Sequence, residues 1–161
     1  MRDIQVAVMM GSKSDLSVME EAAGVFKEFG VSFEMKVLSA HRTPKETAAY
    51  AEQLKSRGAK AVICGAGVSA ALAGVVAAHT DLPVIGVPID AAPLSGLDAL
   101  LSTVQMPPGV PVAAMAIGKA GAKNAALFVL RILATQDKTI EKKLEGFKEE
   151  QRRKILEIDL N

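Results

Sequence analysis

The sequence has little of several residue types, and each shortage argues against a class of function. A single cysteine, Cys64, rules out a disulfide within the chain, which suits a reducing compartment such as the cytoplasm. Aromatic residues make up 4% of the chain, with no Trp, so few side chains could stack on the bases of a nucleic acid. The formal net charge is only +1, which gives no general attraction to nucleic acid or anionic membranes. The N-terminus lacks the layout of a signal peptide, and no apolar run reaches the roughly 18 residues of a membrane helix. We therefore expect a cytoplasmic protein that binds neither nucleic acid nor membranes.

Two kinds of catalytic centre are also poorly supported. Two histidines, one cysteine and no close cluster of ligands argue against a zinc site. No G-x-S-x-G pattern is present, which argues against a serine hydrolase, and no Walker pattern is present either. We expect no bound metal.

The apolar residues, half of the chain, alternate between two kinds of segment. Length fits one domain, and short β-rich runs recur at a spacing of roughly 25 residues, with helix-like stretches between them. This alternation predicts an α/β fold with a parallel sheet covered by helices on both faces. The expected strands are 4–10, 31–38, 60–64, 83–88 and 111–116, and the expected helices are 15–29, 44–57, 70–79, 97–104 and 120–134.

Residues that typically cap helices lie at the ends of the predicted helices. Gly30 and Gly58 are placed as C-terminal caps. Thr43 is placed as an N-cap before Pro44, and Glu46 would complete a capping box.

The last segment differs from the rest. Residues 1–137 form the predicted α/β domain, whereas 138–161 are charge-rich with a narrow apolar stripe at helical spacing. Such a stripe needs a partner surface. The helix either packs on its own domain or, with slightly more support, is an arm that grips a neighbouring subunit.

Ligands of parallel α/β sheets bind beyond the carboxyl ends of the strands, so the loops there are the candidate site. The first loop, Gly11-Ser12-Lys13-Ser14-Asp15, opens a helix and offers hydroxyls and free N–H groups to a phosphate. An ordinary turn with Ser14 or Asp15 as N-cap explains the loop equally well. Asp15 would repel a phosphate and suits sugar hydroxyls better.

The second loop, Ser39-Ala40-His41-Arg42-Thr43-Pro44, carries the strongest candidate for proton transfer. An imidazole can give and take a proton near neutral pH, and Arg42 offers a charged fork for phosphate or carboxylate. The other histidine, His79, ends a helix and is interpreted as structural.

The third loop, 65–74, fits G-x-G-x-x-A, and Asp90 follows twenty residues after Ala70. This pattern is a weak indication of dinucleotide binding, because such matches are common and this one follows the third strand. The glycines could equally allow close approach of any ligand. Two further stretches, 90–96 and 105–109, could cover a site or pack subunits, and Lys119 could point at the site or be solvated.

Six motifs in order resemble one family: 11–15, 39–44, 65–67, 94–98, 104–107 and 116–126. Together they resemble the N5-carboxyaminoimidazole ribonucleotide mutase family of purine biosynthesis, over residues 4 to 137. The resemblance implies a flavodoxin-like three-layer αβα domain with an extra C-terminal helix. It also implies homo-octamers with sites at subunit contacts, and transfer of a carboxylate from the exocyclic nitrogen to ring carbon C4 without any cofactor.

The resemblance assigns roles by motif. His41 would be the catalytic proton carrier, Ser12, Ser14 and Arg42 would bind phosphate, and Asp15 would bind the ribose. The residues expected to bind the ribonucleotide are Gly11, Ser12, Ser14, Asp15, Ser39, Ala40, Arg42, Gly65, Ala66 and Gly67.

One departure stands out. Family members usually continue Gly-Ala-Gly into Ala-His-Leu-Pro-Gly, where this chain has Ala70-Ala71-Leu72-Ala73-Gly74. A second family histidine is thus absent. The sister type, which carboxylates aminoimidazole ribonucleotide directly with carbon dioxide, has Lys after the His. Arg42 is the mutase form, and direct carboxylation stays the alternative.

Overall fold

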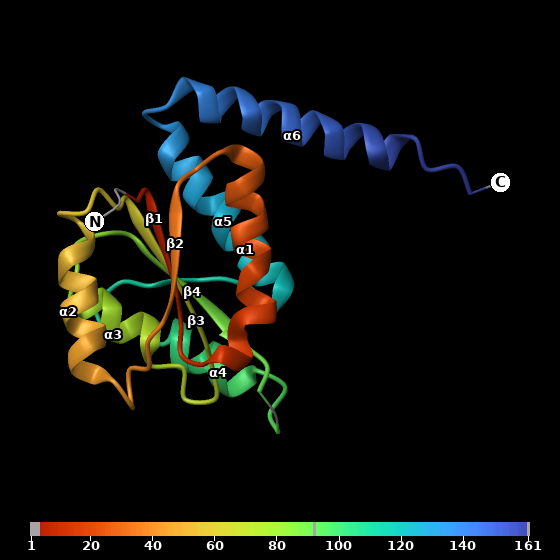
Figure 1. Ribbon diagram of the computed structural model, residues 1–161. Helices are drawn as coiled ribbons and strands as arrows, with labels where there is room; N and C mark the ends of the chain where they lie inside the picture. Colours follow the sequence, from red (N-terminus) through yellow and green to blue (C-terminus); the bar gives the residue numbers. More distant parts are fainter. Residues whose placement is uncertain (1–3, 92, 161) are drawn as a thin grey trace. The chain divides into compact units, whose positions relative to one another are not determined.

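The structure is a computed structural model that describes residues 4–91 and 93–160 (Figure 1). The chain divides into two compact units, Met1–Ala126 and Leu127–Asn161. The boundary falls inside helix α5 (Lys119–Ala134).

The first unit is built on one sheet of five parallel strands. The strands lie in the order β2-β1-β3-β4-β5, which is the strand order of flavodoxin-like folds. They are β1 (Val6–Met10), β2 (Phe33–Val37), β3 (Ala61–Gly67), β4 (Val84–Ile89) and β5 (Ala113–Ala114). The predicted α/β fold and its flavodoxin-like class are confirmed.

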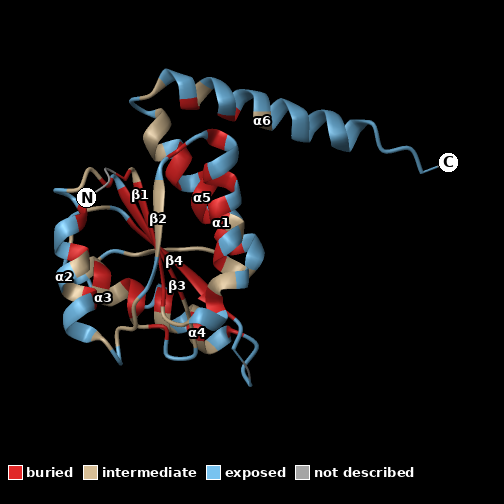
Figure 2. Ribbon diagram, in the orientation of Figure 1, coloured by how far each residue is buried: buried red, intermediate tan, exposed pale blue. Residues whose placement is uncertain are grey.

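Helices cover both faces of this sheet. They are α1 (Leu16–Phe29), α2 (Pro44–Leu54), α3 (Leu72–Ala78), α4 (Leu97–Val104) and the first part of α5. A Cβ on Gly65 of β3 would strike the side chain of Met19 in α1. A Cβ on Gly86 of β4 would approach Ala73 of α3 and Thr103 of α4. These contacts place α1 on one face and α3 and α4 on the other, with the buried strands between them (Figure 2).

The strands differ in burial and in length, and the predicted bounds of the fifth strand are wrong. All residues of β1 and β4 are buried, as their continuous apolar runs predict. The expected fifth strand, 111–116, is reduced to two residues. It lies at the edge of the sheet, Pro111 has no N–H to donate, and Gly118 turns the chain away at φ +76°. One further bond, from Met115 N to Gly86 O at 2.9 Å, continues the pairing.

Helix ends confirm Gly30 as a C-cap and Thr43 as the N-cap before Pro44, and they correct two other predictions. Gly30 is the C-cap of α1 at φ +70°, as predicted. Gly58 also has a positive φ, +89°, but α2 ends earlier, at Leu54, so Gly58 serves the following turn rather than the helix end. The capping box at Thr43 is wrong, because the Thr43 hydroxyl binds back to the main chain of Ser39 instead.

The second unit contains the end of α5 and helix α6 (Lys138–Leu156), which confirms a helix in the tail. The Asp137 carboxylate caps α6 by accepting from Thr139 N at 2.8 Å and Ile140 N at 3.3 Å. The predicted stripe is buried at Ile140 and Leu144 and exposed at its far end. In the part of the chain that is described, no helix combines the length and the apolar character needed to cross a membrane.

Candidate functional site

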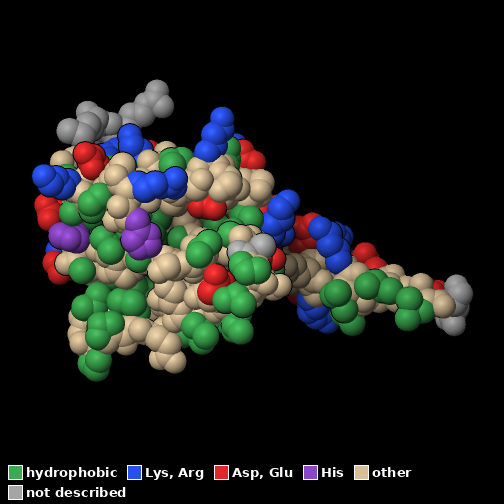
Figure 3. Space-filling model, turned by 90° about the horizontal axis from the view of Figure 1, so that it is seen from below, with side chains coloured by type: hydrophobic (Ala, Val, Ile, Leu, Met, Phe, Trp, Pro, Cys, Tyr) green, Lys and Arg blue, Asp and Glu red, His purple; other side chains and the backbone are tan. Residues whose placement is uncertain are grey.

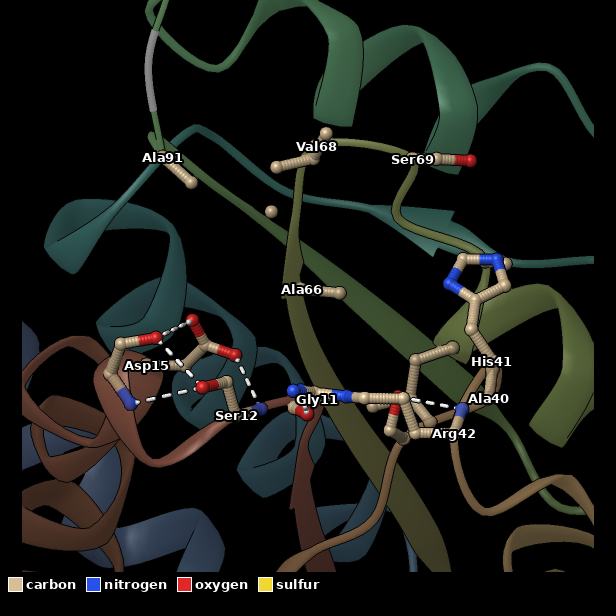
Figure 4. A pocket seen from close by; sticks show the side chains of 15 residues that line it. Gly11, Ser12, Asp15, Ala40, His41, Arg42, Ala66, Val68, Ser69 and Ala91 are labelled. Carbon is tan, nitrogen blue, oxygen red and sulfur yellow. Dashed lines mark hydrogen bonds between the residues drawn. The ribbon is translucent and has the colours of Figure 1, made fainter.

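A cavity of about 410 Å³ lies at the carboxyl ends of β1, β2, β3 and β4 (Figure 4). Its wall comes from the loops after four strands, as expected for a parallel α/β sheet. The lining residues are Gly11, Ser12, Ser14, Asp15, Ser39, Ala40, His41, Arg42, Ala66, Gly67, Val68, Ser69, Ala71, Leu72 and Ala91. Nine of the ten predicted substrate-binding residues, together with His41, are therefore brought to one place.

The loop after β1 is held by a capping box. The Ser12 hydroxyl accepts from Ser14 N at 3.3 Å and from the Ser14 hydroxyl at 2.9 Å. In return, the Asp15 carboxylate accepts from Ser12 N at 2.9 Å. These bonds close the 3₁₀ turn Lys13–Asp15, and α1 starts directly after it at Leu16. The loop is thus fixed at the N-terminus of a 14-residue helix, where an anion is stabilised by the helix dipole.

Asp15 is the most buried ionisable group in this loop. Its relative exposure is 6%, and this burial raises the pKa of its carboxyl group. Hydrogen bonds from Ser12, Ser14 and Gly11 and the charge of Arg42 act in the opposite direction. Because one carboxylate oxygen already binds Ser12 N, Asp15 holds the loop as well as facing the cavity.

The loop after β2 presents His41 and Arg42 and is also tied internally. The Ser39 hydroxyl accepts from Arg42 N at 3.2 Å, and Thr43 Oγ1 accepts from Ser39 N at 2.9 Å. The Arg42 guanidinium reaches across to the first loop and donates from Nη2 to Gly11 O at 3.0 Å. This bond joins the two loops on one side of the cavity.

Two polar side chains of the cavity wall, His41 and Ser69, make no side-chain hydrogen bond to any described residue. Both are exposed, and both face the cavity. In Figure 4 the His41 ring lies toward Ser69 and away from Ser12 and Asp15. Groups that can donate and accept hydrogen bonds are therefore available to a ligand here, beside the loops after β1 and β2.

Gly65 is the one predicted substrate-binding residue that does not line the cavity. It lies within β3, where a Cβ would fall 2.3 Å from Met19 Sδ, and its carbonyl accepts from Gly11 N at 3.2 Å. Close packing against α1 therefore explains this glycine. Gly65, Ala66 and Gly67 are all part of a strand, so they do not form the turn that a dinucleotide-binding fingerprint requires.

One side of the cavity, the far wall, was not predicted from the sequence. This wall is formed by Val68, Ser69, Ala71, Leu72 and Ala91. The available signal was their position after the third and fourth strands, but small and apolar residues give no chemical pattern of their own. Ala71, at the position where the resemblance implies a family histidine, lies in the wall itself.

The other candidates are accounted for by local pairs. His79 Nδ1 lies 3.0 Å from Glu52 Oε1 at the end of α3, in line with a structural role. Lys119 Nζ lies 3.6 Å from Glu21 Oε1 and outside the cavity wall. Among residues 4–91 and 93–160, no three His, Cys, Asp or Glu side chains come together as metal ligands.

Comparison with known proteins identifies the family of this chain. The family model described as "AIR carboxylase" matches residues 5–154. The N5-carboxyaminoimidazole ribonucleotide mutase of Saccharolobus solfataricus is 51% identical over 156 residues, covering 97% of this chain and 98% of its own length. The enzyme of the same name from Escherichia coli is 48% identical over 153 residues, 95% of this chain and 90% of its own. The crystal structure of Treponema denticola PurE superposes with a TM-score of 0.86 at 30% identity, covering 95% of this chain and 94% of that one. The chain belongs to the AIR carboxylase family.

Proposed function

We propose that this protein is an N5-carboxyaminoimidazole ribonucleotide mutase of purine biosynthesis. It would move the carboxylate from the exocyclic nitrogen to C4 of the imidazole ring. The observation that carries the proposal is the joint placement of an imidazole and an anion-binding pair of loops in one cavity. Relatives of that name, about half identical over almost the whole chain, support it.

The ribonucleotide phosphate fits the side of the cavity formed by Ser12, Ser14 and Arg42. There it meets hydroxyl groups, the start of α1 and a planar cation. Asp15, beside this position, accepts hydrogen bonds from the ribose hydroxyls. The base then extends toward His41, whose ring has no competing partner among the described residues.

In the first step His41 acts as an acid. The imidazolium gives its proton to the exocyclic nitrogen, the bond between that nitrogen and the carboxylate carbon breaks, and its electron pair stays on nitrogen. Carbon dioxide and aminoimidazole ribonucleotide are then held side by side, because the cavity keeps the fragments close.

In the second step His41 acts as a base. Ring carbon C4 attacks carbon dioxide, a carbon–carbon bond forms, and the C4 proton passes to the neutral imidazole. His41 is thereby returned to its starting state. An imidazole can both donate and accept a proton, so one group can serve both transfers.

Assembly into homo-octamers in the cytoplasm forms part of this proposal. Apolar side chains exposed in the first unit, at Leu94, Leu97, Leu101 and Val104, support a subunit contact. Figure 3 shows hydrophobic side chains gathered in patches on the surface of the molecule seen from below. The exposed end of the second unit, with Ile155 and Leu156 on α6, supports the arm hypothesis.

The test is conversion of the carboxyamino substrate without added bicarbonate, by the wild type and by His41→Asn. We expect the wild type to form the C4-carboxylated product and His41→Asn to lose at least about 10³-fold in kcat, with substrate binding largely kept. Activity only with aminoimidazole ribonucleotide and carbon dioxide would replace the mutase by the direct carboxylase. Saturable binding of NADH, followed by fluorescence, would instead support the dinucleotide alternative.

A further inference from the structure

Val68 has an unusual backbone conformation at the mouth of the candidate site. Its φ is +55°, and among the described residues only Ser95 shares a positive φ without being glycine. For a β-branched residue this region is a real outlier, because Cβ crowds the main chain. Strain of this kind persists only where the surroundings determine the conformation, and it concentrates at functional sites.

The residues on either side of Val68 restrict its backbone conformation. The preceding residue, Gly67, is still paired with Ile89 of β4, and a Cβ on it would lie 2.8 Å from Ala91 Cβ and 3.0 Å from Ile89 O. Two residues later Ala70 is buried at 1% exposure. The chain must therefore leave the strand and return to the core within Val68 and Ser69.

The side chain of Val68 is nevertheless not part of the core. It is 53% exposed and lines the cavity, on the side opposite the capping-box loop (Figure 4). With Ala71, Leu72 and Ala91 it makes this side of the cavity apolar. A glycine would adopt the same backbone without strain, so the strain is explained by what the side chain does in the cavity.

We propose that Val68 is a specificity-determining wall residue, which keeps released carbon dioxide beside the ring until C4 attacks it. This inference rests on the proposed function. Carbon dioxide is uncharged and forms only weak hydrogen bonds, so methyl groups confine it without binding it tightly. They also keep out water that would carry it away. Val68 touches the reacting fragments without exchanging protons with them.

The experiment follows the carboxylate carbon. Substrate labelled with ¹³C in its carboxylate is converted in buffer containing unlabelled bicarbonate, and mass spectrometry gives the fraction of product that keeps the label. Free aminoimidazole ribonucleotide is measured in the same samples. The variants are Val68→Gly, which removes wall and strain, Val68→Ala, which removes two methyl groups, and Val68→Thr, which keeps the shape. Val37→Ala is the matched control, since Val37 is 50% exposed, lies in a regular strand and is outside the cavity wall.

We expect Val68→Gly and Val68→Ala to lose label at least about threefold more often than the wild type. Val68→Thr keeps the shape but adds a hydroxyl that binds water, so it should lie between these variants and the wild type, and Val37→Ala should match the wild type. Relief of strain should also raise the melting temperature of Val68→Gly by about 2 °C. Unchanged label retention in Val68→Gly and Val68→Ala overturns the inference, as does an equal loss in Val37→Ala. A wild type that converts no substrate contradicts the proposed function itself, and that outcome is distinct from either.

Discussion

The two sides of the cavity are built in opposite ways. The side formed by the loops after β1 and β2 is polar and closed by hydrogen bonds, with Arg42 joined to Gly11 O at 3.0 Å. The side formed after β3 and β4 is mainly apolar, with Val68, Ala71, Leu72 and Ala91. Its one hydroxyl, that of Ser69, makes no hydrogen bond to the rest of the described chain. One side suits a charged, fixed group, and the other suits a neutral fragment that must stay only briefly.

Both sides carry a cost in stability. On the polar side the cost is electrostatic, because Asp15 is buried and the pKa of its carboxyl group is raised. On the apolar side the cost is conformational, because Val68 has a φ of +55°. Costs at two separate points of one cavity indicate that function, as well as folding, determines these residues.

The largest effect on the comparison is expected from Arg42→Ala. This change removes the guanidinium that faces the proposed phosphate position and also breaks the bond to Gly11 O. Charge-assisted bidentate bonds to phosphate are strong, so we expect KM to rise about 100-fold with a smaller change in kcat.

Steady-state kinetics of Arg42→Ala and Arg42→Lys provide the check. Arg42→Lys keeps the charge but not the fork and should lie between the alanine variant and the wild type. A KM for Arg42→Ala within twofold of the wild type would mean that the polar side does not hold the phosphate.

A smaller, two-part effect is expected from Asp15→Asn. An amide can still accept from Ser12 N, so the loop should stay closed, but the charge that favours ribose hydroxyls is lost. We expect KM to rise about tenfold, as for loss of a hydrogen bond to a charged group.

The stability of Asp15→Asn should change with pH in a definite direction. Because the pKa of Asp15 is raised in the folded state, the folded protein loses stability as pH rises through that pKa. The variant lacks this loss, so its melting temperature should exceed the wild type's by about 2 °C at pH 7 and match it below pH 4. Thermal unfolding followed at both pH values decides this, and an advantage independent of pH would contradict the electrostatic cost.

The polar side could be predicted from the sequence far better than the apolar side. His41, Arg42 and Ser12 carry chemistry in their residue type, and their place after apolar runs put them at one sheet edge. The capping box was predicted at Thr43 but lies at Ser12 and Asp15, because both pairs fit the pattern and only the packed turn distinguishes them. The role of Val68 could not be predicted from the sequence. Its left-handed conformation depends on the tertiary contacts of Gly67 and Ala70, which the local sequence does not reveal. Gly65 was predicted to bind the ligand, whereas it packs against Met19 of α1, a residue far from it in the sequence.

The smallest effect is expected from Glu34→Gln. This change tests whether the polar side of the cavity depends on interactions outside its own loops. Glu34 of β2 accepts from both Nη atoms of Arg57 and from the Tyr50 hydroxyl at 2.9 Å. The Arg57 side chain is only 12% exposed, so removing its partner charge should lower the free energy of unfolding by about 1 kcal/mol at pH 7. Arg57 lowers the pKa of Glu34, so this contribution is lost as pH falls through the lowered pKa, and the difference from wild type should shrink in acid.

Denaturant unfolding at pH 7 and at acid pH, together with KM at pH 7, tests this last point. Glu52→Gln is the matched control, because Glu52 pairs with His79 where both side chains are well exposed, and such pairs contribute little. We expect KM to be unchanged in both variants, since Ser39, Arg42 and Thr43 are held by bonds within their own loop. A raised KM in Glu34→Gln alone would show that strand β2 transmits its anchoring to His41 and Arg42. The polar side would then be fixed by the whole edge of the sheet rather than by its loops, and the contrast with the locally strained Val68 would be sharper.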